Sequence, residues 1–217
     1  HGRMKVAVSR LHFPVTALGP GQRVGLWFQG CSLRCPGCIS VDTWDASLGG
    51  TTIAELLGAM EPLVPDASGL TVSGGEPFEQ PAALAEVLHF WRRRSATSIL
   101  VFTGHEIEDV APWLGRNPGL VDGLMTGPYR SELSQTIAMR GSDNQRLHKL
   151  TPLGQEFGAF DRPLTPADRA LDVMFDDDGA AWFAGIPARG DFARLRRALS
   201  GAGHDVQMSD SIRNLAP

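Results

Sequence analysis

Three cysteines within eight residues are the side chains of this sequence best suited to chemistry. Cys31, Cys35 and Cys38 are all the cysteines in the 217 residues, so their clustering predicts that they act together. An odd number of thiols leaves no complete disulfide scheme, and the reducing conditions of the cytosol oppose one. The spacing therefore favours three thiolates that bind a metal.

Two kinds of metal site remain open for these thiols. A structural zinc site needs a fourth ligand, and the candidate histidines stand at no recognised knuckle spacing: His12, His89 and His105. A cubic [4Fe-4S] cluster can be held by three protein thiolates, which leaves its fourth iron open. An open metal position is where a substrate binds, as in catalytic zinc sites. We favour the cluster and keep zinc as the alternative.

A second motif follows a predicted strand at residues 70–73 and consists of Ser73, Gly74, Gly75 and Glu76. The cysteines follow another predicted strand, so both motifs are expected at the carboxyl rim of the fold, where α/β barrels hold their chemistry. Two glycines leave backbone groups open to a ligand, and the Glu76 carboxylate can accept from an ammonium group. Taken alone, the motif also fits a turn with an acidic residue at the start of a helix.

The elements that must position these motifs alternate between strands and helices. Apolar runs predict strands at residues 4–8, 24–29, 70–73, 98–103 and 121–125. Capping residues and apolar spacing predict helices that start near Thr52, Pro81 and Ile107. This alternation predicts an α/β fold with a parallel sheet and right-handed crossovers. The large aromatic residues of these elements are expected in the core: Trp27, Phe28 and Trp91.

The pattern changes after residue 150. Residues 150–166 are rich in glycine, proline and polar side chains, which predicts a connector. Apolar runs at 171–175 and 180–184 predict a hairpin, with a turn at 176–179, and Asp191 is predicted to cap a following helix. The aspartates of the turn lack the ligand spacing of an EF-hand loop, so we expect no calcium there. We divide the chain into a core domain, 4–150, and a connector with a C-terminal extension, 151–217.

Composition narrows the class of protein. With 217 residues, 42% of them hydrophobic, the chain is expected to form one domain with a small appendage that folds without disulfides. A net charge of −4 without a long basic run argues against a nucleic-acid surface. No apolar run approaches the ~18 residues that could span a bilayer. We therefore expect a cytoplasmic protein that binds neither nucleic acid nor membrane.

Together, the CxxxCxxC spacing and the Gly-Gly-Glu motif resemble those of the radical S-adenosylmethionine (SAM) superfamily. The sequence is most similar to the small activating proteins of anaerobic ribonucleotide reductase, over roughly residues 12–150. The segments that carry this resemblance are 19–23 (GPGQR), 30–38 (GCSLRCPGC), 43–44 (TW), 73–77 (SGGEP), 101–104 (VFTG) and 140–145 (RGSDNQ).

The resemblance implies a fold, two cofactors and a reaction. The fold would be an incomplete parallel (β/α) barrel of the TIM type, followed by the small α+β extension. The three cysteines would hold a [4Fe-4S] cluster, and its open iron would bind the amino and carboxylate groups of SAM. Reductive cleavage of SAM would yield methionine and a 5′-deoxyadenosyl radical that abstracts a hydrogen atom. The partners would be an electron donor such as flavodoxin or ferredoxin and a glycyl radical enzyme.

The resemblance also assigns the residues around SAM. Gly74, Gly75 and Glu76 would meet its methionine amino group, with Ser73 beside them as a further cofactor-binding residue, and the backbone of Gly37, Cys38 and Ile39 would line its adenine. Thr103, at the end of a predicted strand, and Asn144, in the RGSDNQ segment, are expected near SAM.

Three departures from the wider superfamily bear on these expectations. Gly37 stands where much of the superfamily has an aromatic residue that packs on adenine, although the activating proteins commonly have Pro-Gly here. Glu76 stands where some activating proteins have aspartate, which is also an acceptor. The extension has no counterpart in the minimal activating protein.

Three hypotheses of function follow. The first is an activating enzyme that installs a glycyl radical on a large partner. The second is a stand-alone radical SAM enzyme for a small molecule or peptide, whose pocket the extension completes. The third is a non-catalytic protein that binds a cluster or zinc.

Overall fold

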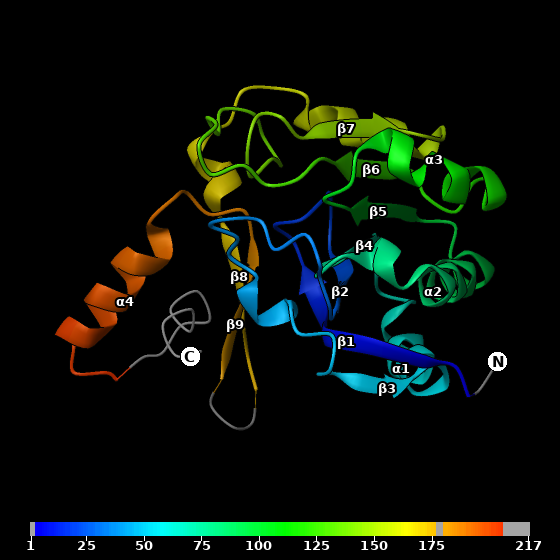
Figure 1. The fold of residues 1–217 in the computed structure, drawn as a ribbon, viewed down its shortest axis with the longest axis horizontal. Coiled ribbons are helices and arrows are strands. Elements are labelled where there is room, and N and C mark those ends of the chain that lie inside the picture. Colours follow the sequence, from blue (N-terminus) through cyan, green and yellow to red (C-terminus); the bar gives the residue numbers. More distant parts are fainter. Residues whose placement is uncertain (1–2, 177–179, 206–217) are drawn as a thin grey trace.

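A computed structural model describes residues 3–176 and 180–205 of the chain. Seven strands form one mixed sheet in the order β3-β1-β2-β4-β5-β6-β7, and β8 and β9 form a separate two-stranded sheet (Figure 1). The strands are β1 (Lys5–Val15), β2 (Arg23–Phe28), β3 (Gly50–Thr52), β4 (Gly69–Gly74), β5 (Ser98–Phe102), β6 (Gly123–Thr126), β7 (Arg146–Lys149), β8 (Leu171–Phe175) and β9 (Ala181–Gly185). The α-helices are α1 (Ile53–Met60), α2 (Pro81–Arg94), α3 (Ile107–Arg116) and α4 (Asp191–Gly201).

The centre of the large sheet is parallel, as the alternating pattern predicts. Strands β2, β4, β5 and β6 run parallel to one another, with Leu26 opposite Val72 and Val72 opposite Val101. The outer strands β1, β3 and β7 are antiparallel. The first strand, β1, is longer than the expected residues 4–8. It also runs antiparallel to β2, whereas the alternating pattern predicts a parallel strand. Its link to β2 is too short for the crossover of a dozen or more residues that a parallel neighbour requires.

Local capping explains where the first helix begins. The Thr52 side chain accepts a hydrogen bond from the backbone N–H of Glu55 at 3.2 Å, and Glu55 Oε2 accepts from the backbone N–H of Thr52 at 2.9 Å. This reciprocal capping box is the one expected from the sequence. Helix α2 begins at Pro81, also as expected, because proline at the first helical position lacks only an N–H that would be unpaired there.

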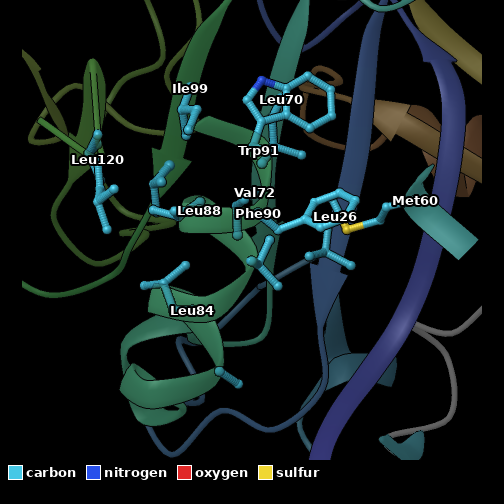
Figure 2. Close-up of a cluster of buried hydrophobic side chains, with 14 of the residues drawn as sticks. Leu26, Met60, Leu70, Val72, Leu84, Leu88, Phe90, Trp91, Ile99 and Leu120 are labelled. Atoms are coloured by element: carbon cyan, nitrogen blue, oxygen red, sulfur yellow. The ribbon is translucent and has the colours of Figure 1, made fainter. Parts of the chain in front are cut away.

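The main core lies between the sheet and the three helices α1 to α3. In Figure 2, Leu84, Leu88 and Trp91 of α2 lie against side chains of β2, β4 and β5. Trp91 and Phe28 are fully buried, which confirms their expected place in the core. Burying a large apolar side chain contributes roughly 1.5–3 kcal/mol, so this face supplies much of the free energy of folding.

A second apolar cluster covers the opposite face of the sheet and contains Trp27, Met125, Met139 and Ala184. Ala184 belongs to β9, so the small sheet packs on this face. The hairpin is also held by Asp172, whose carboxylate accepts from the backbone N–H groups of Thr16 at 2.7 Å and Ala17 at 2.8 Å. Strands β8 and β9 are antiparallel, and most of the predicted turn at 176–179 lies outside the described residues.

Helix α4 differs from the expectation in one detail. Gly190, with φ of 82°, precedes the helix as its N-cap, and Asp191 is its first residue. The Asp191 carboxylate accepts from the backbone N–H of Ala188 at 2.6 Å, so it closes the turn before the helix. Across the described ranges, no helix has both the length and the apolar character needed to cross a membrane.

Candidate active site

The cysteine loop leaves the end of β2 and is closed at its base. The backbone N–H of Gly30 donates to Thr43 O at 2.7 Å, and that of Cys31 donates to Trp44 O at 3.2 Å. Gln29 Nε2 donates to the carbonyls of Asp42 and Asp45, both at 2.9 Å. These bonds hold both ends of the loop together, so the three thiols are confined to a short, closed segment.

The three thiols are free and partly exposed. Burial raises the pKa of Cys31 and of Cys38, and the neighbouring thiolates of Cys35 and Cys31 raise the pKa of Cys38 further. The backbone N–H of Cys38 also donates to Cys35 O at 3.1 Å, which places these two residues side by side in the loop. A bound metal must displace the protons of such thiols, because the thiolate is the form that binds metals.

No three His, Cys, Asp or Glu side chains in the described ranges are arranged to hold one metal ion. A [4Fe-4S] cube does not require that arrangement, because each thiolate binds a different iron. Three free thiols on one closed loop fit the donor set of such a cluster.

The Ser73–Glu76 motif is tied directly to the cysteine loop. Gly75 N–H donates to Phe28 O, and Glu76 N–H donates to Gly30 O, both at 2.8 Å. A Cβ atom on Gly74 would lie 2.3 Å from the backbone N and O of Phe28, and one on Gly75 would lie 2.1 Å from Gly30 O. The two glycines are thus required by the close approach of this turn to the end of β2.

Glu76 is almost completely buried, with 1% of its surface exposed. Its carboxylate accepts from Thr103 Oγ1 at 2.8 Å, from Gly104 N at 2.8 Å and from Phe78 N at 3.0 Å. Burial raises the pKa of Glu76, while these three hydrogen bonds act in the opposite direction. A carboxylate offers about four acceptor positions, so one remains for a cationic ligand.

Two neighbouring cavities bring most of the predicted site residues together. The smaller, about 160 Å³, is lined by the three cysteines, residues 73–76 and Thr103. The larger, about 340 Å³, is lined by Gly37, Cys38, Ile39 and Ser73 together with residues 183–190 of the C-terminal segment. Five residues line both: Cys38, Ser73, Phe102, Tyr129 and Gln145. The two cavities therefore form one continuous site.

Two predicted residues have supporting places in this site. The Thr103 hydroxyl bonds Glu76, and it also accepts from His105 N at 3.1 Å. Asn144 is absent from the described lining of both cavities. Its Nδ2 donates to Pro128 O at 2.8 Å, and its buried Oδ1 has no hydrogen-bond partner among the described residues. A direct contact of either residue with SAM stays a prediction.

Sequence reasoning missed several residues that line the site, above all Tyr129. This residue follows β6 in the segment Thr126-Gly127-Pro128-Tyr129, at the carboxyl end of a parallel strand. That position was the available signal, because the carboxyl ends of parallel strands form the same rim. Trp27, expected only in the core, is 6% exposed and also lines the larger cavity.

Comparisons with known proteins match the same part of the chain. The family model described as "4Fe-4S single cluster domain" matches residues 17–148. An anaerobic ribonucleoside-triphosphate reductase-activating protein from Enterobacteria phage T4 is 34% identical over 136 residues, which are 59% of this chain and 85% of that protein. The protein of that name from Escherichia coli (strain K12) is 27% identical over 149 residues, which are 64% of this chain and 96% of that protein. A pyruvate formate-lyase-activating enzyme from Clostridium pasteurianum is 35% identical over 92 residues, 40% of this chain and 39% of that enzyme. The family match includes both motifs and Tyr129 and ends before β8.

Proposed function

Because the chain belongs to the 4Fe-4S single cluster domain family and to the anaerobic ribonucleoside-triphosphate reductase-activating proteins, we propose that it is a radical SAM enzyme that installs a glycyl radical on such a reductase. One observation carries the proposal: three free thiols and the buried Glu76 carboxylate line the same cavity. This pairing brings a cluster-binding donor set next to an acceptor for an ammonium group.

Cys31, Cys35 and Cys38 are the proposed ligands of a [4Fe-4S] cluster, and their number leaves one iron for SAM. The chemistry supplied by the bound cluster and SAM is one-electron cleavage of SAM to methionine and a 5′-deoxyadenosyl radical, which takes a hydrogen atom from the partner. The electron would come from a donor such as flavodoxin or ferredoxin. The chain itself supplies binding, orientation and exclusion of water.

The chain's own residues would hold SAM from both ends. Glu76 accepts from the methionine ammonium group with its remaining acceptor position, while Thr103 keeps the carboxylate oriented. Ser73, Gly74 and Gly75 line the space beside it. Gly37, Cys38 and Ile39 line the larger cavity, where the adenosyl group would lie. Asn144 would act from behind the lining, because its Nδ2 donates to the carbonyl of Pro128, the residue before Tyr129, which lines both cavities.

We propose that residues 4–150 form the radical SAM core, with the open, largely parallel sheet as its incomplete barrel, and that residues 151–217 form the appended segment. The cluster ligands must stay reduced, so we propose that the enzyme works in the cytoplasm.

The test is release of 5′-deoxyadenosine by anaerobically reconstituted protein with SAM and dithionite, followed by electron paramagnetic resonance of an added anaerobic ribonucleoside-triphosphate reductase. We expect release of the nucleoside and a glycyl radical on the reductase. Cys35→Ala should abolish both, while Pro36→Ala, an exposed neighbour in the same loop, should retain both. Protein that binds zinc and releases no 5′-deoxyadenosine would contradict the proposal. Release without a radical on the reductase would contradict the choice of partner.

A further inference from the structure

The ring of Tyr129 lies between two glycines that come from different parts of the chain. A Cβ atom on Gly37 would be 3.5 Å from Tyr129 Cε1, and one on Gly141 would be 3.2 Å from Tyr129 Cδ2. Gly37 has φ of 79°, a backbone conformation that favours glycine. The two edges of the ring are therefore placed against two stretches of bare backbone.

Tyr129 also stands where the two cavities meet. It lines the smaller cavity, which holds the thiols and Glu76, and the larger one, which holds Gly37 and Ile39. Phe102, at the end of the neighbouring strand β5, lines both cavities as well. A ligand that extends from Glu76 into the larger cavity passes the residues that line both cavities, and these two rings are the aromatic side chains among them.

The C-terminal segment holds the loop that carries this ring. The Arg189 guanidinium carbon is 6.0 Å from the centroid of the Tyr129 ring, the outer limit of a cation–π contact. Its Nη2 donates to the backbone carbonyl of Leu133 and, at 3.4 Å, to that of Arg130. Arg189 lies between β9 and α4, beyond the residues that the family model matches. The segment after β7 therefore contributes to the wall of the site.

The geometry points to Tyr129 as the residue on which the adenine of SAM packs, with Arg189 as the positioning residue that holds its ring. This inference rests on the proposed function, because it requires SAM in the continuous site. An aromatic ring offers a π face to a base, and such stacking tolerates a plain ring without the hydroxyl. Tyr129 thus provides the aromatic surface that Gly37 does not, and the C-terminal segment becomes part of SAM binding.

A single probe can test this directly, because the chain contains one tyrosine. Biosynthetic 3-fluorotyrosine gives one ¹⁹F resonance, which belongs to Tyr129. We expect this resonance to shift as S-adenosylhomocysteine is added to the cluster-reconstituted protein. The Kd from this shift should equal the Kd that calorimetry measures for the same ligand. A resonance that stays fixed while S-adenosylhomocysteine binds overturns the inference. Absence of binding to the unsubstituted protein would instead contradict the proposed function.

Variants separate the ring from a general effect on folding. Tyr129→Leu should raise the Kd for S-adenosylhomocysteine about tenfold, the scale of one base–aromatic stack, whereas Tyr129→Phe should stay within about twofold. Arg189→Gln should move the resonance of the ligand-free protein and raise the Kd about threefold. Arg197→Gln, on an exposed position of α4, should change neither. The stacking role would be overturned if Tyr129→Leu had the same Kd as the unsubstituted protein. It would also be overturned if Tyr129→Leu and Tyr129→Phe raised the Kd by the same factor. An unmoved resonance in Arg189→Gln would overturn the positioning role.

Discussion

Replacing Thr103 with valine would test how Glu76 is held in place. Valine keeps the shape of threonine but removes the hydroxyl, which donates to Glu76 Oε1 at 2.8 Å and accepts from His105 N at 3.1 Å. Thr103 is 5% exposed and Glu76 is 1% exposed, so water cannot readily replace these bonds. A hydrogen bond to a charged group contributes about 1.5–3 kcal/mol and a neutral one about 0.5–1.5 kcal/mol. We expect Thr103→Val to lower the free energy of unfolding by about 2–4.5 kcal/mol.

The assay is urea unfolding of the cluster-free protein, followed by the KM for SAM of the reconstituted protein. The KM should rise, because Glu76 loses one of the three donors that orient its carboxylate. Thr103→Ser is the matched control: it removes a methyl group but keeps the hydroxyl, so its KM should remain near that of the unsubstituted protein. If valine and serine variants were equally stable and had equal KM values, the role assigned to the hydroxyl would be wrong.

Three further predictions concern the turn at the site, the first helix and the C-terminal hairpin. Gly74→Ala should prevent iron incorporation, measured as iron per chain, because φ of 114° and a Cβ 2.3 Å from the Phe28 backbone force the turn away from β2; normal iron content would count against this requirement. Hydrogen bonds from Thr52 and Thr51 lower the pKa of Glu55 from 4.5 to about 2, so Glu55 contributes stability above pH 4.5 that is lost as the pH falls through about 2. Acid unfolding curves of Glu55→Gln should lack that loss, and identical pH dependence in both proteins would contradict it. Asp172→Ala should speed hydrogen exchange in β8 and β9 and leave β4 and β5 unchanged, since it removes the bonds to Thr16 and Ala17; unchanged exchange in the hairpin would show that other contacts hold it.

The elements that the sequence predicts well are those set by neighbouring residues. The capping box of Thr52 and Glu55 needs only residues three apart, and the structure has it. The apolar runs that form β2, β4 and β5 are buried on both faces of the sheet. A strand buried on both faces has a continuous apolar sequence, so the sequence predicts these strands. The type and spacing of the three cysteines likewise indicate a metal site, with a [4Fe-4S] cluster favoured over zinc.

Other features depend on contacts between distant parts of the chain. The antiparallel direction of β1 depends on its pairing with β2 and β3. The sequence predicts that the Glu76 carboxylate can accept from an ammonium group. Only the structure shows that it also accepts from Thr103 and Gly104, which lie beyond the next helix. Such hydrogen bonds leave no local pattern in the sequence, because they form only when β4 and β5 pair.

The sequence alone thus indicated a metal site at the cysteines, the alternation of the central strands and helices, and the two motifs, since each rests on residue type and short spacing. Only the tertiary structure decided that Tyr129 lies between Gly37 and Gly141 and that Arg189 reaches its loop. The physical reason is that a side chain in a folded protein is placed by packing against whatever segment the fold brings beside it. Which segment lies beside a given side chain depends on the fold of the whole chain and not on the residues next to that side chain in the sequence.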